Sequence, residues 1–468
     1  MTLIHRTDAR SPWLADTPRP KLEDTARALE DYVERRRIYD ALTQRRDHVE
    51  PSINAFELRD ETCPASISGP LNGLPVTVKD QIAVAGWPRS FGLERLSKRP
   101  DTTSASLVAR LLDIGAVVTG KTALPPNAMD FQTGNARRGP TRNPHNPQFT
   151  SGGSTGGGAA AVASGMSPLD IGADLSGSLR IPAAWCGVCS YVPTEGLWPN
   201  DGLLRGTQRL DHFARIGLTA PSAQDLNFVW KALDADSEMP ATSTSDARIA
   251  VWSPAAKPPC DDETFKAWQS LAQALPHRDF DIIRDDMHDL LDPSVHQLGG
   301  EIIGHMTGAL VPAFIRWMMR RDRRAAAISP NFVSHVHTGY RRDPQRYQEN
   351  LDRLAAFRKR AERRCSGYEA LLLPVTPVCA FRHIAPLRDQ SGVRTYEAVF
   401  ETQAGPVGYF DALTHFTLPL TVLGWPVVTF PVSRDANGLP SGAQLIGKPG
   451  GDRRLLALAT QVQSALRW

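Results

Sequence analysis

Short β-branched runs and amphipathic helical segments alternate at both ends of the chain. Residues 73–80, "GLPVTVKD", form a short apolar run that ends in a charged pair, which predicts a strand with Lys79 at its end. A helix is predicted over 104–114, with Gly115 as its stop. Further strands are predicted over 116–120, 369–378, 426–433 and 442–447. This rhythm favours one α/β sheet with helices on both faces.

Helical spacing of apolar residues predicts three more elements. Near the N-terminus the repeat predicts one amphipathic helix, and its face consists of Leu22, Ala26, Leu29 and Val33. Residues 221–235 form a helix that Ser222 is placed to cap. The last helix begins at Asp452 and carries Leu455, Ala459, Val462 and Leu466 on one face.

Changes in composition divide the chain into four parts. Residues 1–64 are expected to be a helical segment that packs on the core, and 65–240 the part of the α/β core that carries the candidate catalytic residues. Residues 241–368 are rich in Arg, Asp and His and mostly helical in pattern, which indicates a peripheral insertion. Residues 369–468 complete the core.

Charge, hydropathy and cysteine content narrow the classes of partner and compartment. The formal net charge is +3, from 53 basic and 50 acidic residues, which is too small to indicate nucleic acid or an anionic membrane as the main partner. No apolar run approaches the ~18 residues that would span a bilayer. The N-terminus lacks a secretory pattern, and six cysteines are sparse for this length. We therefore expect a cytoplasmic protein.

The glycine-rich stretch "SGGSTGGG" at 151–158 is open to three interpretations. A phosphate cradle is disfavoured because no GxxxxGK[ST] is present and no strand precedes the glycines. A nucleophile elbow is disfavoured because the residues before Ser154 are polar and include proline, although Gly152 to Gly156 match GxSxG. The third interpretation adds a second serine, Ser178 in "GADLSGSLRIPAAWCG", and Lys79 as a base.

With these three residues the chain resembles the amidase signature family. The likeness rests on Lys79 in "GLPVTVKD", Ser154 in "SGGSTGGG" and Ser178, at the spacing that family shows. Segments such as "LLLPVTPV" and "GLPSGAQLIGKPG" match in the same order, so the resemblance runs from about residue 69 to the C-terminus apart from the middle insertion. It implies the amidase signature fold, with a central mixed twisted sheet and helices on both faces.

The resemblance also implies a role for each matching residue. Ser178 would be the nucleophile that attacks an amide carbonyl, and Lys79 would be the base. Ser154, joined to Gly153 by a cis peptide bond, would relay the proton between them. The oxyanion hole would consist of the backbone N–H groups of Leu175, Ser176, Gly177 and Ser178. Ala128 and Met129 correspond to a loop that lines the substrate. Asp174 and Arg180 are expected to brace the oxyanion turn.

A lysine can act as a base near neutral pH only when its amine is uncharged. The usual pKa of lysine is ~10.4, and burial away from water and carboxylates lowers it, so we expect Lys79 to be buried with a pKa of about 7–8. Several residues near the predicted site, among them Thr155, Ser176 and Ala173, depart from the family pattern, and these departures do not exclude activity.

The sequence thus predicts an amidase, a hydrolase that acts on carbon–nitrogen bonds other than peptide bonds, in linear amides. It would work on a small-molecule amide through an acyl-serine intermediate. No cofactor or metal is expected, since Cys186 and Cys189 lack a second ligand pair. Two alternatives stay open: a glutamine amidotransferase A-type subunit that supplies ammonia within a complex, and a non-catalytic binding or scaffold protein. A homodimer is the default oligomer. Substrate choice is expected to depend on residues 123–133 and 300–340.

Overall fold

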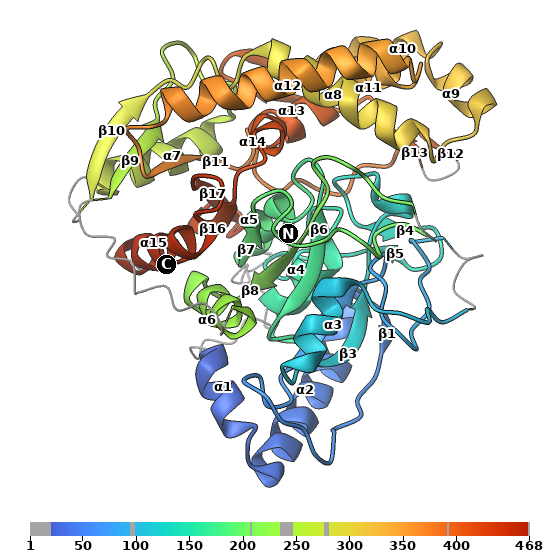
Figure 1. Ribbon diagram of the computed structural model, residues 1–468, viewed down its shortest axis with the longest axis vertical. Coiled ribbons are helices and arrows are strands. Elements are labelled where there is room, and N and C mark those ends of the chain that lie inside the picture. The colour runs from blue at the N-terminus through green and yellow to red at the C-terminus, as the bar shows by residue number, and fades with distance from the viewer. Residues whose placement is uncertain are drawn as a thin grey trace, which may run out of the picture.

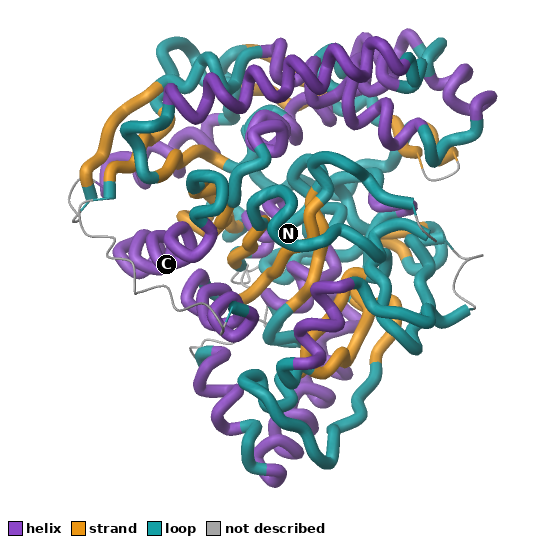
Figure 2. Tube along the Cα trace, in the orientation of Figure 1, coloured by secondary structure: helices purple, strands orange, loops and turns teal. Residues whose placement is uncertain are grey.

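One mixed sheet of eleven strands runs through the molecule (Figures 1 and 2). The computed structural model describes residues 20–93, 99–205, 208–234, 247–275, 280–390 and 393–466. In spatial order the strands are β1 (Phe56–Arg59), β3 (Val117–Thr122), β2 (Pro75–Lys79), β6 (Asp170–Asp174), β8 (Arg215–Ala220), β7 (Cys189–Val192), β16 (Val427–Arg434), β17 (Pro440–Ile446), β11 (Ala370–Pro374), β9 (Arg248–Trp252) and β10 (Asp281–Asp285). Strand β2 is parallel to both of its neighbours, whereas β6, β8, β7, β16 and β17 follow one another antiparallel. The predicted mixed α/β fold is confirmed.

Helices of different composition cover the sheet. α4 (Gly156–Ala163) packs on β2, β6 and β8, and α5 (Arg180–Cys186) packs on β7, β16 and β17. All residues of α4 are buried, and a Cβ at Gly157 would lie 2.4 Å from the backbone nitrogen of Ala123. The small residues of this helix therefore allow it to lie directly on the strands that carry the candidate site.

The other core helices agree with the predicted elements. α3 (Ser106–Asp113) is followed by Gly115, whose φ of 96° only glycine adopts easily. α6 (Ala223–Leu233) is capped by Ser222, whose side chain accepts a hydrogen bond from the backbone N–H of Asp225. α15 (Asp452–Leu466) begins at the predicted residue and packs against α6.

The N-terminal segment contains two helices where the pattern predicts one. α1 (Leu22–Ala28) ends before α2 (Tyr32–Ile53), and the side chain of Asp31 caps α2 by accepting from the N–H of Glu34. The break resets the helical phase, so Val33 is 64% exposed although Leu22 is buried as expected. Both helices lie at the lower end of the view in Figure 1.

The middle region is less uniformly helical than its composition suggests. Strands β9 and β10 extend the main sheet at one edge, with α7 (Asp262–Ala274) between them. β9 is a short buried run, and β10 has only two adjacent apolar residues between charged ones, so neither stands out among helical patterns. Residues 241–246 lie outside the described part. The division of the chain into four parts stays a prediction.

From Pro293 onward the region is helical, and it forms the layer at the top of Figure 1. The helices are α8 (Pro293–Gly308), α9 (Ala313–Met319), α10 (Arg323–Ile328), α11 (Val333–Gly339) and α12 (Pro344–Arg364). α13 (Tyr409–Thr414) and α14 (Thr417–Leu423) follow later in the chain, and α14 packs on α8 and α12. This layer is thereby connected to the core through α14.

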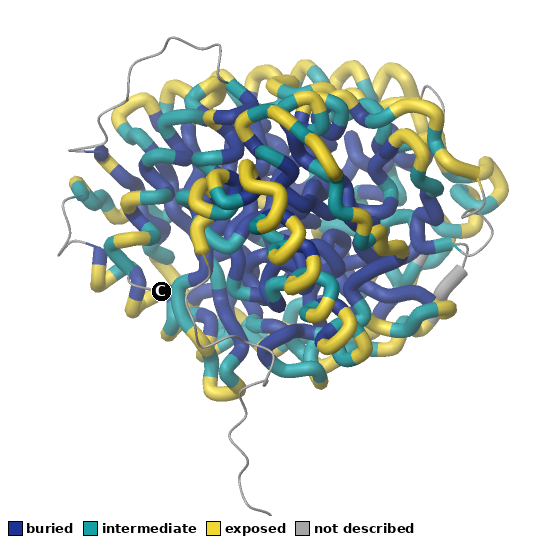
Figure 3. Tube along the Cα trace, turned by 90° about the horizontal axis from the view of Figure 1, so that it is seen from below, coloured by how far each residue is buried: buried dark blue, intermediate teal, exposed yellow. Residues whose placement is uncertain are grey.

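Three two-stranded hairpins and a short 3-10 turn complete the described elements. They are β4 (Gly134–Asn135) with β5 (Gly139–Pro140), β12 (Arg388–Gln390) with β13 (Val393–Thr395), β14 (Val399–Thr402) with β15 (Gly405–Gly408), and η2 (Pro126–Ala128). Figure 3 shows buried positions filling the interior while exposed positions follow the outer turns of the helices. None of the helices in the described ranges is long and apolar enough to cross a membrane.

Candidate active site

Lys79 is the last residue of β2, in the interior of the main sheet. Its side chain is 1% exposed, and its Nζ donates a hydrogen bond to Ser154 Oγ over 2.7 Å. Since β2 lies between β3 and β6 and beneath α4, the amine is shielded on all sides. The expected burial of Lys79 is found, and so is its contact with one of the two serines.

Burial decides the protonation of this amine. Desolvation lowers the pKa of Lys79 to about 7, although the negative charges of Asp170 and Asp174 act to raise it. The sequence led us to expect no carboxylate nearby, so the two aspartates are a correction to that picture. Above pH 7 the amine is mostly neutral and can accept a proton.

Ser154 and Ser178 lie on two buried turns that are hydrogen-bonded to each other. The backbone N–H of Thr155 donates to the carbonyl of Ser178 over 3.0 Å, and the side chains of both serines are almost fully buried. The peptide bond between Gly153 and Ser154 is cis. A Cβ at Gly153 would lie 2.8 Å from the carbonyl oxygen of Asp130, so only glycine allows the turn to pack so closely. The structure thus brings Lys79, Ser154 and Ser178 to one place.

Asp174 organises the turn that precedes Ser178. Its carboxylate forms a fully buried ion pair with Arg180 (2.9 Å) and accepts hydrogen bonds from the N–H groups of Gly177 (2.9 Å) and Leu179 (3.1 Å). Burial alone raises the pKa of Asp174, but the charge and hydrogen bonds of Arg180 outweigh it and the pKa falls to about 2. The expected bracing of the turn by this pair is therefore present.

The same contacts show which of the four predicted oxyanion donors already has a hydrogen-bond acceptor. The N–H of Gly177 is already bonded to Asp174, which departs from the expected set. Within the described ranges, the N–H groups of Leu175, Ser176 and Ser178 donate to no protein acceptor. Three of the four predicted donors therefore remain available to a ligand.

A residue of α14 fixes this turn from the other side. Thr417 Oγ1 donates to the carbonyl of Ser176 over 2.6 Å. Gly177 has a φ of 124°, and a Cβ there would lie 2.8 Å from Thr417 Oγ1. A glycine is thus required at 177, whereas Ser176 is accommodated. Sequence reasoning had no signal for Thr417, because it lies far from the turn along the chain.

The predicted substrate loop lies beside the catalytic turn. Ala128 and Met129 are partly exposed, and the next residue, Asp130, is buried against Gly153. Asp130 accepts hydrogen bonds from the hydroxyls of Tyr396 and Tyr409, the latter over 2.8 Å. Arg394 Nη1 also donates to it over 3.1 Å. The segment around β13 and α13 therefore holds the loop in place, a link that no local motif indicated.

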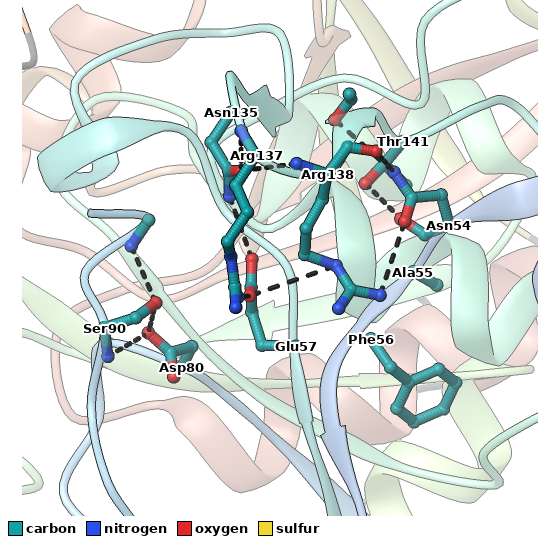
Figure 4. A network of polar contacts seen from close by, with 12 residues as sticks. Asn54, Ala55, Phe56, Glu57, Asp80, Ser90, Asn135, Arg137, Arg138 and Thr141 are labelled. Carbon is teal, nitrogen blue, oxygen red and sulfur yellow. Dashed lines mark hydrogen bonds and ion pairs between the residues drawn. The ribbon is translucent and has the colours of Figure 1, made fainter. Parts of the chain in front are cut away.

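A second polar network, around the buried carboxylates of Asp80 and Glu57, involves segments that precede and follow this loop in the chain (Figure 4). Asp80 accepts from the N–H and the hydroxyl of Ser90, each over 2.8 Å, and the carbonyl of Phe91 accepts from Asn127 N–H. On the other side Glu57 is paired with Arg137 over 2.6 Å. Asp80 thus holds the Ser90–Phe91 turn that contacts Asn127, and Glu57 holds the β4–β5 hairpin that follows the loop.

The residues that a metal would need are not grouped. The described ranges contain no cluster of three or more His, Cys, Asp or Glu side chains that could hold an ion. Cys186 and Cys189 are free and buried, and burial raises the pKa of both thiols. They face different partners, the Ser151 carbonyl and the Gln463 amide.

Comparisons with known proteins identify the family of the chain. A family model described as Amidase matches residues 48–456. The chain is 28% identical to the A subunit of glutamyl-tRNA(Gln) amidotransferase from Thermus thermophilus over 485 residues, which covers 95% of this chain and 96% of that protein. It is 34% identical over 228 residues to indoleacetamide hydrolase of Pseudomonas savastanoi, a match that spans 48% of either chain. A crystal structure of an amidase superposes with a TM-score of 0.77 at 25% identity, covering 96% of this chain and all of that one. The chain therefore belongs to the Amidase family of enzymes, which hydrolyse carbon–nitrogen bonds.

Proposed function

We propose that the protein hydrolyses the carboxamide of a small molecule through an acyl-Ser178 intermediate and releases ammonia or an amine. The observation that carries this proposal is the 2.7 Å hydrogen bond from the buried Nζ of Lys79 to Ser154 Oγ. A neutral amine in that position is a base that can act on a serine near neutral pH.

In the acylation step Ser178 Oγ attacks the amide carbon. Its proton passes to Ser154 Oγ, whose own proton passes to Lys79 Nζ, so that one ammonium and one oxyanion form. The N–H groups of Leu175, Ser176 and Ser178 supply the donors that the oxyanion needs; one such donor is typically worth ~10²–10³ in rate. When the C–N bond breaks, the proton returns by the same route to the leaving nitrogen. Water then attacks the acyl ester with Lys79 again as base.

A fluorophosphonate probe tests the chemistry without knowledge of the substrate. We expect the full-length protein to be labelled on Ser178, and Ser178→Ala to abolish labelling. Ser176→Ala, which removes a hydroxyl from the same turn, serves as the matched control and should leave labelling intact. An unlabelled but folded wild-type protein would show that the family member is non-catalytic and acts by binding alone.

Specificity is proposed to depend on the loop that contains Ala128 and Met129, together with residues 300–340. The loop lies on the backbone of Gly153, and its anchors come from Tyr396 and Tyr409. A panel of aliphatic, aryl and ureido amides, assayed by ammonia release, identifies the substrate class. Replacing Met129 by Ala should change the ranking of substrates while Ser178 labelling persists.

A second candidate function rests on the full-length likeness to the amidotransferase protein of Thermus thermophilus. In that case the protein would hydrolyse glutamine only when partner subunits are present. Ammonia release from glutamine by the isolated protein, with and without added partner subunits, separates the two functions. Efficient hydrolysis of simple amides by the isolated chain favours the amidase.

A further inference from the structure

Asp170 is a buried acid on the same face of the sheet as Lys79. It is the first residue of β6 and pairs in register with Thr77 of β2, which lies two residues before Lys79. The side chains of Asp170, Thr77 and Lys79 therefore point to the same side of the sheet. Asp170 is 0% exposed. Its Oδ1 accepts hydrogen bonds from Thr77 Oγ1 (2.7 Å) and Thr122 Oγ1 (3.1 Å).

The second oxygen of this carboxylate is unpaired. Asp170 Oδ2 has no hydrogen-bond partner within the described part of the chain. It lies against α4 at Gly158, where a Cβ would come within 1.9 Å of it. Glycine at 158 therefore provides the space for this carboxylate oxygen, which makes no structural hydrogen bond on the side of α4.

Among the charged groups around Lys79, Asp170 is the carboxylate whose charge is not already balanced by an arginine. β6 contributes Asp170 and Asp174, and the charge of Asp174 is already balanced by Arg180. Helix α4, which covers this face, has the sequence GGGAAAVA and carries no titratable side chain. On β3, Lys121 pairs in register with Val78 and so points to the opposite face from Lys79.

We propose that Asp170 is a positioning residue that supplies the counter-charge for the ammonium formed when Lys79 takes the serine proton. This inference rests on the proposed function. No bond forms or breaks at Asp170: the Ser178 proton passes to Ser154 Oγ, the Ser154 proton passes to Lys79 Nζ, and the carboxylate stays ionised throughout. Its charge stabilises the state after proton transfer more than the state before it, which is how a fixed charge speeds a reaction.

The titration of the two groups is consistent with this role. Burial raises the pKa of Asp170 to about 7, against the hydrogen bonds from Thr77 and Thr122 and the charge of Lys79. Burial lowers the pKa of Lys79 to about 7 as well. Above pH 7 the pair therefore holds a carboxylate and a neutral amine, which is the starting state that the mechanism needs.

The test is the pH dependence of Ser178 labelling by a fluorophosphonate in the full-length protein and in Asp170→Asn. Without the carboxylate the ammonium is less stable, so the pKa of Lys79 falls further. We expect the acid limb of the profile to move to lower pH by about one unit, the low end of the shift that a neighbouring charge produces. The rate on the alkaline plateau should fall about tenfold, the equivalent of one pKa unit.

Two further variants separate this electrostatic role from a structural one. Asp225→Asn is the matched control: Asp225 is also buried with a pKa raised by burial, but it binds the Leu22 N–H and Ser222, and its replacement should leave the limb in place. Thr122→Val keeps Asp170 but removes a hydrogen bond that favours its ionised form. Loss of this hydrogen bond raises the pKa of Asp170, so the carboxylate ionises only at higher pH. This variant should therefore move the limb to higher pH, opposite to Asp170→Asn, and it provides the test if Asp170→Asn does not fold.

The outcomes distinguish this inference from the proposed function. If the wild-type protein is not labelled at any pH, the proposed function fails and Asp170 has no catalytic partner to serve. If the wild type is labelled on Ser178 while Asp170→Asn keeps the same acid limb, only the role of Asp170 is overturned. A uniform loss of rate with no shift likewise overturns it.

Discussion

At the scale of single residues, the proposed chemistry depends on one buried amine and two hydroxyls. Lys79→Ala and Ser154→Ala should lower kcat by several orders of magnitude, because removing a positioned acid–base group typically costs ~10²–10⁴ in rate and here also breaks the relay. Ser178→Ala should abolish the acyl-enzyme. In the wild type kcat/KM should rise with pH through about 7, where Lys79 loses its proton. Near-normal turnover in any of the three variants would refute the role assigned to that residue.

Most of this site was predictable from the sequence, and the exceptions have a common cause. The motifs around Lys79, Ser154 and Ser178 are local, so their residues can be identified from the chain alone. The hydrogen bond from Gly177 to Asp174 could not be, because it depends on the orientation of a single peptide unit. Thr417 was missed because its contact with Ser176 forms only in the folded chain.

At the scale of elements, the loop that carries Ala128 and Met129 is held by the carboxylate of Asp130. Asp130→Asn weakens the bonds from Tyr396, Tyr409 and Arg394, so the loop should become less ordered. We expect KM to rise about tenfold, equivalent to about 1.4 kcal/mol, with a smaller change in kcat. Steady-state kinetics measure both.

The matched control for this experiment is Asp452→Asn. Asp452 is a buried carboxylate that accepts from a tyrosine, Tyr191, over 2.6 Å, but it belongs to α15 rather than to the loop. Its replacement should lower stability and leave KM unchanged. Equal effects on KM in both variants would contradict a special role for Asp130.

A row of buried polar side chains crosses the strands beside the site. Asp170, Thr219, Ser190 and Thr429 occupy successive positions in register on β6, β8, β7 and β16. The side chains of all four are buried, and each has an oxygen without a hydrogen-bond partner in the ranges that the structure describes. An unpaired buried polar group costs free energy.

Replacing one of the hydroxyls in this row should therefore stabilise the fold. Thr429→Val is expected to raise the free energy of unfolding by about 1 kcal/mol, measured by urea denaturation. Thr119→Val is the control, since Thr119 is equally buried in a strand but its hydroxyl accepts from Arg46 over 2.8 Å. That variant should lose stability. If Thr429→Val lowered the free energy of unfolding and Thr119→Val raised it, this assignment of unpaired and paired hydroxyls would be contradicted.

Elements were predicted best where the apolar pattern is long or has a clear stop. α15 begins at Asp452 and α6 is capped by Ser222, both as expected. The N-terminal helix was divided by the cap at Asp31, because a local hydrogen bond overrides a continuous apolar spacing. Strands β9 and β10 were missed because strands of five residues leave little periodicity to detect.

At the scale of the whole molecule, acid should loosen the helical layer that consists of α8 to α12. Glu301 of α8 is buried, which by itself raises its pKa, but hydrogen bonds from Arg346, Asn350 and Gln297 lower it to about 2. The folded value lies below the unfolded value of 4.5, so this contribution to stability is present above pH 4.5 and is lost as the pH falls towards 2.

Hydrogen exchange measures that loosening directly. Amide exchange in α8 and α12 should increase between pH 4.5 and 2 once intrinsic rates are corrected, and Glu301→Gln should show fast exchange at neutral pH with no further change in acid. The helices α6 and α15 provide the internal reference, because none of the residues that bind the Glu301 carboxylate lies in them. A wild-type layer with constant protection across this range would exclude Glu301 as the sensor.

The proposed reactive groups come from the first part of the chain, and several side chains that anchor the turns around them come from the last quarter. Lys79, Ser154 and Ser178 all precede β7, whereas Tyr396, Tyr409 and Thr417 come from the last quarter of the sequence. A chimera that joins the first part of this protein to the second part of a relative would therefore take Lys79, Ser178 and the loop with Met129 from one parent, and the side chains that anchor them from the other. Recombination between β8 and β11 is the natural place to redesign this enzyme.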